Sequence, residues 1–274
     1  MRKNARCLAM LLISNGILWA AGPPERGPFH WPAGKRAAIS LTYDDARQSQ
    51  VDTALAILDK YGVKATFYLS PAAVPSRLEG WKKAAAAGHD LGNHSRTHPC
   101  TGNYAFSFDN ALEDYGPERI AGELDGANAD IERMLGVKAV SFAYPCGQKF
   151  VGRGKGVESY VPLVAERFLT GRGYRDEAAN DPRVCDLAQL TGMAMDELDA
   201  KQAMALVNEA VRQGRWLVFV SHEVGAPAFQ TTDPAVLEAV LKFAKDPANG
   251  IWIDTVRAVG EYVKGQRAGQ KSSE

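Results

Sequence analysis

The chain of 274 residues has no excess charge of either sign, because 32 lysines and arginines match 32 aspartates and glutamates. It also lacks a basic block and an acidic tail. A basic block is typical of nucleic-acid-binding proteins, and an acidic tail is typical of proteins with a charged partner. We therefore expect no nucleic-acid partner, and no sequence feature sets the oligomeric state.

The apolar run at the N-terminus is too short for a membrane-spanning helix. Residues 1–6 carry three positive charges, and residues 7–21 are mostly apolar and end in the small residues Ala20-Ala21-Gly22. This order is typical of a cleaved export signal. A membrane anchor is the alternative, but the run is interrupted at Ser14-Asn15-Gly16 and falls short of the ~20 residues that span a bilayer. We predict a signal peptide over residues 1–22, an exported (periplasmic or secreted) protein, and no membrane partner after cleavage.

Internal repeats and linkers are also lacking. About 250 residues remain after the signal, an ordinary size for one α/β domain. Strand-like apolar runs alternate with helical patterns, which favours parallel strands covered by helices. We expect strands at 37–43, 63–69, 89–93, 140–144, 216–220 and 251–253, with weaker candidates at 166–170 and 187–191. We expect helices at 51–61, 81–87, 117–135, 196–213, 234–244 and 255–263.

Cysteine is scarce. Apart from the predicted signal, the chain has Cys100, Cys146 and Cys185. An exported protein can oxidise one pair, but three cysteines allow three pairings, and spacing does not choose among them.

Histidine is scarce too, with five in the chain, yet His94 and His98 are four residues apart. Residues at this spacing on a helical turn share one face, so both rings can reach one ion. Two surface histidines on a loop are the alternative. Imidazole and carboxylate are the ligands that a divalent transition metal such as zinc prefers. With Asp45 as a third ligand, an open coordination position would remain, which is typical of catalytic sites.

The acidic pair Asp44-Asp45 follows directly on the first expected strand. Adjacent residues project in different directions, so both cannot easily bind the same ion. We expect one to ligate the metal and the other to act as a base. A helix N-cap pair is the alternative.

Polar groups follow four of the expected strands: Asp44-Asp45, His94, the turn at 144–147 and His222. In a parallel barrel these strand ends form the active-site face. His222 is suited to general-acid chemistry, although a buried core histidine is the alternative. A backbone N–H in the turn can stabilise an oxyanion, although an ordinary strand-ending turn is the alternative.

Together these segments resemble the polysaccharide deacetylases of carbohydrate esterase family four, the NodB-homology domain. The resemblance covers residues 35–264, which leaves 265–274 as a polar C-terminal tail. It rests on Thr42-Tyr43-Asp44-Asp45-Ala46, His94-Ser95-Arg96-Thr97-His98, Phe142-Ala143-Tyr144-Pro145-Cys146-Gly147 and Val218-Phe219-Val220-Ser221-His222.

The resemblance implies a single α/β domain, a distorted (β/α) barrel with about seven parallel strands. It implies removal of N-acetyl, or O-acetyl, groups from a carbohydrate polymer or oligosaccharide with a divalent metal, zinc above all. The site residues would be Asp44 as base, Asp45, His94 and His98 as metal ligands, His222 as acid, the Cys146 backbone N–H as oxyanion donor, and Tyr144, Pro145 and Gly147 at the substrate.

Two features of the family pattern are missing. Ala143 stands where many members have an arginine that orients the base, and no Asp-x-x-Asp-Trp motif occurs between Gly147 and Trp216. We hypothesise that Arg172 replaces the arginine and lies near Asp44.

Several alternatives share this motif set. The chain could be a metal-dependent amidohydrolase acting on a non-sugar amide, an acetylxylan-type esterase, or an inactive carbohydrate-binding protein. The Gly-rich segment 147–160 is expected to face the substrate. Cys100 and Cys146 should both lie near the site, either as a disulfide or as free thiols. The aromatic residues that could form sugar platforms are Trp81, Tyr104, Phe106, Phe108, Tyr115, Phe150 and Tyr160.

Overall fold

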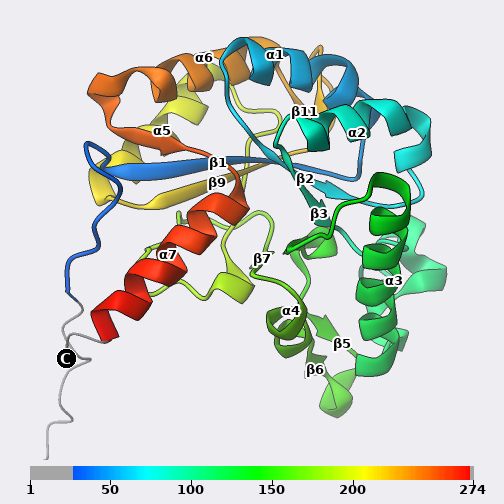
Figure 1. The fold of residues 1–274 in the computed structure, drawn as a ribbon. Helices are drawn as coiled ribbons and strands as arrows, with labels where there is room; N and C mark the ends of the chain where they lie inside the picture. The colour runs from blue at the N-terminus through cyan, green and yellow to red at the C-terminus, as the bar shows by residue number, and fades with distance from the viewer. Residues whose placement is uncertain (1–26, 272–274) are drawn as a thin grey trace, which may run out of the picture.

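The computed structural model describes residues 27–271, so the predicted signal peptide lies outside the described residues. Within them, a sheet of eight parallel strands curls into an incomplete barrel (Figure 1). The order is β7-β4-β3-β2-β1-β9-β8, and β12 pairs with the first half of β1. The expected barrel of about seven parallel strands is therefore confirmed. The strands are β1 (Ala37–Asp44), β2 (Thr66–Leu69), β3 (Asp90–Asn93), β4 (Ser141–Ala143), β7 (Thr170–Arg172), β8 (Met193–Ala194), β9 (Trp216–Ser221) and β12 (Ile251–Ile253).

Helices form an outer arc around this sheet, in which α5, α6, α1 and α2 follow one another (Figure 1). Helix α7 contacts both β1 and β7. No helix in the described residues is long and apolar enough to cross a membrane. The helices are α1 (Leu55–Lys60), α2 (Leu78–Ala86), α3 (Pro117–Leu135), α4 (Val161–Arg167), α5 (Ala200–Gln213), α6 (Pro234–Lys245) and α7 (Val256–Lys271).

The side chains of β1 alternate between two environments. Ile39, Leu41 and Tyr43 belong to the largest hydrophobic cluster, which α1, α5 and α6 help to form. Because successive strand residues point to opposite faces, Ser40 and Asp44 lie on the other face. Asp44 is thus the last residue of that second face, at the carboxyl end of the strand.

An irregular segment bridges the open side of the barrel, between β7 and β9. Leu190 donates its N–H to the carbonyl of Gly171 and accepts from the N–H of Gly173, both at 2.7 Å. Three residues later, β8 pairs with β9. Residues 190–194 therefore connect the two sides of the sheet, and the expected strand at 187–191 is instead a short 3-10 turn (Leu187–Gln189) followed by this bridge.

The expected strand at 166–170 is wrong in its first half. Helix α4 occupies residues through Arg167, and β7 begins at Thr170. Pro162 stands in the first turn of α4, where a proline is favoured. Val164 and Phe168 are both buried in one hydrophobic cluster, so the apolar pattern belongs to the helix and its exit.

The expected helix at 196–213 begins too early. Asp199 caps α5 by accepting from the backbone N–H of Gln202, whose side chain bonds back to the cap, and the helix therefore starts at Ala200. The last helix is longer than expected, because α7 continues to Lys271. Residues 265–271 of the expected C-terminal tail are consequently helical.

Candidate active site

A cavity of about 780 Å³ lies at the carboxyl ends of β1, β3, β4 and β9. Parallel strands end at the same edge of the barrel, so they gather side chains that are distant in sequence. The residues lining the cavity include eight that the sequence singled out: Asp44, Asp45, His94, His98, Tyr104, Phe106, Cys146 and His222.

Asp44 forms a buried ion pair with Arg172. The guanidinium Nη2 donates to Oδ1 of Asp44, Nη1 donates to the carbonyl of Gly173 at 2.7 Å, and both side chains are almost fully buried. The contact hypothesised from the sequence is present. Burial raises the pKa of Asp44, but Arg172, together with His94 and His222, outweighs burial and holds that pKa below its usual value. Asp44 is therefore a carboxylate at neutral pH.

Gln50, which the sequence analysis does not single out, joins the two strand ends that carry Asp44 and His222. Its Nε2 donates to the backbone carbonyl of Asp44 at 2.5 Å and to that of His222 at 2.8 Å. It lies five residues past the acidic pair, in the turn that leads to α1, and no sequence pattern marks it.

Asp45, His94 and His98, called the metal triad below, converge on one point. Oδ1 of Asp45 lies 3.6 Å from Nε2 of His94 and 3.4 Å from Nε2 of His98. Ligand atoms about 2.0–2.2 Å from a tetrahedral zinc ion lie roughly 3.4 Å apart. The donor atoms of the triad therefore fit one divalent ion.

Contacts within and around the metal triad orient His94 and set the protonation of His98 and Asp45. Nδ1 of His94 lies 2.9 Å from the carbonyl of Ala143, which makes Nδ1 the donor and turns Nε2 toward Asp45. Burial and the neighbouring His94 lower the pKa of His98 to about 4, so its ring is neutral. Burial raises the pKa of Asp45, but nearby histidines and Arg47 outweigh burial and lower the pKa to about 2. Neutral imidazoles and a carboxylate are the forms that bind a metal.

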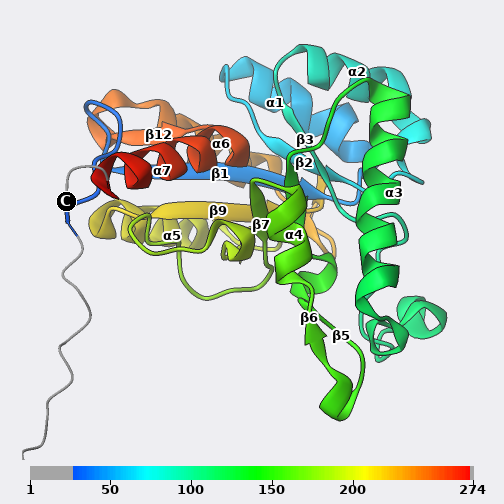
Figure 2. The ribbon, with the colours of Figure 1, turned by 60° about the horizontal axis from the view of Figure 1, so that its bottom comes forward.

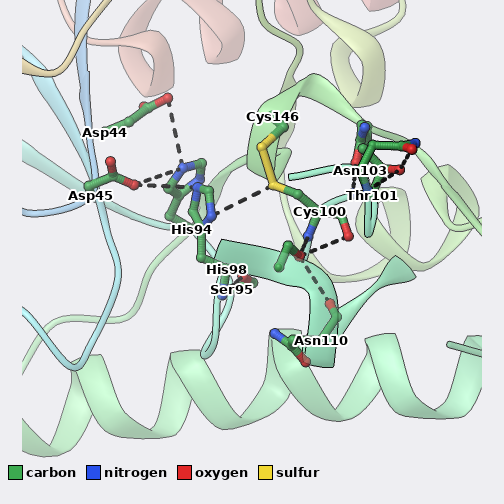
Figure 3. The surroundings of a disulfide bond; sticks show 12 residues. Asp44, Asp45, His94, Ser95, His98, Cys100, Thr101, Asn103, Asn110 and Cys146 are labelled. Atoms are coloured by element: carbon green, nitrogen blue, oxygen red, sulfur yellow. Dashed lines mark hydrogen bonds and ion pairs between the residues drawn. A yellow bond between two sulfur atoms is a disulfide. The ribbon is translucent and has the colours of Figure 1, made fainter. Parts of the chain in front are cut away.

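Cys100 and Cys146 form a disulfide beside the metal triad (Figure 3). Its sulfurs lie close to His98, with Nδ1 of the ring 3.7 Å from Sγ of Cys100. His98 and the two cysteines are close enough to form a second possible metal site. Because the two sulfurs are bonded to each other, however, neither can act as a thiolate ligand. The sequence left open whether Cys100 and Cys146 are a disulfide or free thiols. In the structure they form the disulfide, and Cys185 is a free thiol.

His222 has a carboxylate partner that the sequence reasoning missed. Its Nδ1 lies 2.7 Å from Oδ2 of Asp196, which also accepts at Oδ1 from the hydroxyl of Thr232 at 2.8 Å. Burial lowers the pKa of His222, but Asp196 and the nearby Asp44 outweigh burial and raise the pKa above its usual value. The helix expected at 196–213 would begin at Asp196, whereas α5 begins at Ala200. The capping pair of Asp199 and Gln202, recognisable in the sequence, is the signal that could have freed Asp196 for another role.

Left-handed backbone conformations gather around this cavity. In the described part of the chain, every non-glycine residue with positive φ either lines the cavity or is next in sequence to a site residue. Such conformations are costly and persist where the surroundings impose them, often at functional sites. The residues are Asp45, Ala46, Ser95, His98, Cys146, Arg175, Glu197 and Gln230.

Some expected substrate contacts lie elsewhere. The side chain of Tyr144 is fully buried and donates its hydroxyl to the carbonyl of Ala188 at 2.7 Å, and Pro145 is buried as well. Gly147 lines a neighbouring cavity instead. Of the aromatic candidates, Tyr104 and Phe106 line the site, together with Tyr174 and Phe229, which the sequence reasoning did not name. Trp81, Tyr115 and Tyr160 are core residues.

Residues 32–152 match the sequence model of a family described as polysaccharide deacetylase. This segment belongs to that family. The resemblance expected from the motifs is thereby confirmed, and the match contains the metal triad and Asp44. It ends before Arg172, Asp196 and His222.

Two curated relatives are similar to parts of the chain. It is 39% identical over 93 residues to the uncharacterized protein YlxY of Bacillus subtilis (strain 168), which covers 34% of the chain and 26% of that protein. It is 28% identical over 143 residues to a gellan lyase of a Bacillus species, which covers 52% of the chain and 5% of that protein. The chain thus spans about a quarter or less of the curated relatives it matches.

Solved structures of the family have the same fold. A polysaccharide deacetylase of Mycobacterium smegmatis superposes with a TM-score of 0.66 at 17% identity, covering 89% of this chain and 96% of that one. A family 4 acetyl xylan esterase of Clostridium thermocellum in complex with cobalt superposes with a TM-score of 0.55 at 21% identity, covering 83% and 92%. At these identities the similarity establishes the fold.

Proposed function

We propose that this protein is a metal-dependent hydrolase that removes acetyl groups from a carbohydrate polymer or oligosaccharide. The observation that carries the proposal is the convergence in one cavity of an ionised Asp44, the metal triad and a His222–Asp196 pair. The family match over the first three motifs supports it. The similar Clostridium structure, an esterase crystallised with cobalt, supports a divalent ion and leaves N- and O-acetyl groups both open to test.

The metal triad would hold the ion, and zinc suits its nitrogen and oxygen donors. Such an ion polarises a carbonyl and lowers the pKa of water. Two hydrogen bonds from the surrounding chain orient the histidines of the triad. The carbonyl of Ala143 orients His94, and the hydroxyl of Ser95 accepts from the backbone N–H of His98 at 3.0 Å.

Asp44 is the proposed general base. Arg172 holds its Oδ1, and Oδ2 lies 3.8 Å from Nε2 of His94, so the second oxygen faces the metal triad. That oxygen would accept a proton from the water that attacks the acetyl carbonyl carbon. The ion pair keeps the carboxylate in the basic form and fixes its orientation.

His222 is the proposed general acid. Asp196 binds Nδ1, which leaves Nε2 on the cavity side to donate a proton to the departing amine or alcohol. Its raised pKa favours the protonated form that an acid needs. The backbone N–H of Cys146, in the turn after β4, is the proposed donor to the oxyanion.

Acetate release tests the proposal. Purified protein would be assayed on acetylated chitooligosaccharide, peptidoglycan and acetylated xylan, before and after treatment with a chelator. We expect release from at least one substrate, its loss after chelation, and its recovery with added Zn²⁺ or Co²⁺. Asp44→Asn should reduce the rate by about 10²–10⁴-fold, the usual contribution of a general base. Asp52→Asn, an exposed carboxylate paired with Arg77, is the matched control and should leave the rate unchanged.

Other outcomes would favour the alternatives. Release that survives complete metal removal would contradict the metal triad as a catalytic site. Binding of the glycans without acetate release would favour a carbohydrate-binding protein. Activity confined to small non-sugar amides would favour an amidohydrolase.

We also propose that the protein is exported. The Cys100–Cys146 disulfide supports this, since such bonds persist in oxidising compartments and are rare in the cytosol. The predicted signal peptide points to the same location. Detection of the mature protein outside the cytoplasm, with an N-terminus near residue 23, would test both statements.

A further inference from the structure

Arg175 lines the active-site cavity and carries a charge that the cavity wall does not neutralise. The two carboxylates of that wall, Asp44 and Asp45, already pair with Arg172 and Arg47. Arg175 forms no ion pair with any carboxylate in the described part of the chain. One guanidinium is therefore left over at the site, and an anionic ligand would complement it.

Backbone hydrogen bonds hold the segment that carries Arg175. The chain leaves β7 in a long loop that reaches the start of β9 before it returns to β8 (Figure 2). Where this loop begins, Gly173 donates its N–H to the carbonyl of Leu190 at 2.7 Å, and Asp176 donates its N–H to the carbonyl of Gly192 at 3.0 Å. The carboxylate of Asp176 also accepts from the N–H of Gly192 at 2.8 Å. Arg175 lies between these two anchors, and the neighbouring carboxylate is already occupied.

The backbone of Arg175 is left-handed, with a φ of +59°. This conformation is costly for a residue with a Cβ and persists where the surroundings impose it. The preceding residue, Tyr174, packs closely on the turn after β4, because a Cβ at Gly147 would lie 2.9 Å from the backbone nitrogen of Tyr174. The same turn holds Cys146, the proposed oxyanion donor. Arg175 is thus fixed beside the reacting centre.

Tyr174 links Arg175 to the proposed acid. Its ring meets the ring of His222 edge-on with the centroids 5.5 Å apart, and the guanidinium of Arg175 lies 5.2 Å from the centre of the Tyr174 ring. Glu197 is a nearby carboxylate, but its Oε1 accepts from the backbone N–H of Gln230 at 3.0 Å. The charge of Arg175 therefore remains available to a ligand in the cavity.

We infer that Arg175 makes this site selective for anionic glycans, by binding a carboxylate that the sugar chain carries near the acetyl group to be removed. The inference rests on the proposed function and names its substrate class. A guanidinium suits this role, because its planar fork of N–H donors matches a carboxylate and is weakly hydrated. A divalent ion held by the metal triad would add positive charge to the same cavity. The carboxylate could belong to a uronic acid in the chain or to a carboxyalkyl ether on the acetylated sugar itself.

Carboxylate dependence tests the inference. Acetate release would be measured on acetylated glucuronoxylan, which carries a uronic acid, and on peptidoglycan strands freed of their peptides, which carry a carboxyalkyl ether. Each would be compared with its carboxyl methyl ester, which is uncharged. We expect the wild type to prefer the free carboxylate of at least one pair by about tenfold in kcat/KM, a typical effect of a hydrogen bond to a charged group. Added salt should lower this ratio.

Variants assign the preference to Arg175. Arg175→Gln, which removes the charge, should bring the ratio to about one, and Arg175→Lys, which keeps the charge without the fork, should give an intermediate ratio. Arg212→Gln is the matched control, because Arg212 is exposed on α5 and pairs with Glu209, and this variant should keep the wild-type ratio. A wild-type ratio near one on both pairs, or a ratio that survives Arg175→Gln, would overturn the inference.

A binding experiment separates failure of this inference from failure of the proposed function. In an Asp44→Asn background, calorimetric titration with short oligomers of both glycans, as free carboxylates and as methyl esters, reports affinity without turnover. A preference for the charged oligomer that Arg175→Gln abolishes would support the carboxylate site even if no substrate releases acetate. Equal affinities for the charged and esterified forms of both oligomers would overturn it.

Discussion

At the scale of single residues, the ion pair of Asp44 and Arg172 joins positions 128 residues apart. Nη1 of Arg172 is bound by a backbone carbonyl, and the guanidinium lies 4.9 Å from the centre of the Tyr68 ring. A buried charge is tolerated when it is paired and hydrogen-bonded, and removing one partner leaves the other charge buried and uncompensated. The pair therefore links the chemistry of the base to the stability of the barrel.

Arg172→Met should leave the Asp44 carboxylate buried without its cation. We expect a loss of about 3–5 kcal/mol in the free energy of unfolding and at least a tenfold loss of acetate release. Urea unfolding of metal-free protein, followed by tryptophan fluorescence, would measure the stability. In Arg172→Met/Asp44→Asn neither charge remains, so part of the stability should return. An equal loss in the single and double variants would contradict the coupling.

The partnership of His222 and Asp196 predicts a change in the pH dependence of activity. Asp196 raises the pKa of His222, and a general acid loses activity as pH rises through that pKa. Asp196→Asn should lower the pKa, so the alkaline limb of the kcat/KM profile should move to lower pH. Asp199→Asn, which touches only the cap of α5, should leave that limb in place. If the alkaline limb of the profile does not move in Asp196→Asn, His222 is not the general acid.

At the scale of elements, the turns after β3 and β4 carry the two histidines of the metal triad and the proposed oxyanion donor. Hydrogen bonds between their strands are few, with Asn93 and Phe142 as the paired residues. The disulfide supplies a covalent link just beyond them, two residues after His98. It closes a loop over a sequence separation of 46.

The double variant Cys100→Ser/Cys146→Ser should unfold about 4 kcal/mol more easily, on the chain-entropy model for a loop of this size. We also expect weaker metal binding, because the loop that carries His98 loses its tether. Competition with a chromogenic chelator would measure the affinity. Cys185→Ser, which removes the free thiol, should change neither quantity. Unchanged metal affinity in the double variant would restrict the disulfide to a stabilising role.

At the scale of the whole molecule, the formal charge is balanced. Repulsion between like charges therefore contributes little to the pH dependence of stability near neutral pH. Individual buried groups then decide how stability varies with pH. His89 is such a group: its Nδ1 accepts from the N–H of Ala65 at 3.1 Å, and its Nε2 has no hydrogen-bond partner among the described residues, with Oδ1 of Asp59 3.9 Å away. Burial, with the nearby Lys64, lowers the pKa of His89 to about 4.

A folded-state pKa below the unfolded value means that the unfolded chain binds more protons between pH 6.5 and 4. The contribution of His89 to stability is therefore complete above pH 6.5 and is lost as pH falls toward 4, by up to about 3 kcal/mol. His89→Asn, whose amide oxygen can replace Nδ1 as acceptor, should unfold with a shallower dependence on acid. Urea midpoints from pH 7 to 4 would measure the difference. Parallel curves for the two proteins would contradict this assignment.

The local pattern of the sequence was sufficient to predict many strands and helices of the barrel. β1, β9 and α3 appear within a residue or two of their expected bounds, because each has a long and regular apolar pattern. The expectations failed at α4, where a short amphipathic helix runs into a short strand. They also failed at the start of α5, because Asp199 caps this helix and not Asp196, where the helix was expected to begin.

The sequence by itself determined the parallel α/β class and singled out Asp45, His94 and His98 as candidate metal ligands, because period, strand ends and ligand chemistry are local properties. The family resemblance already suggested Arg172 beside Asp44, whereas only the tertiary structure placed Asp196 on His222 and Gln50 between two strands. The physical reason is that these contacts join segments far apart along the chain, which the closing of the barrel brings to one edge. Local propensity carries no information about such partners.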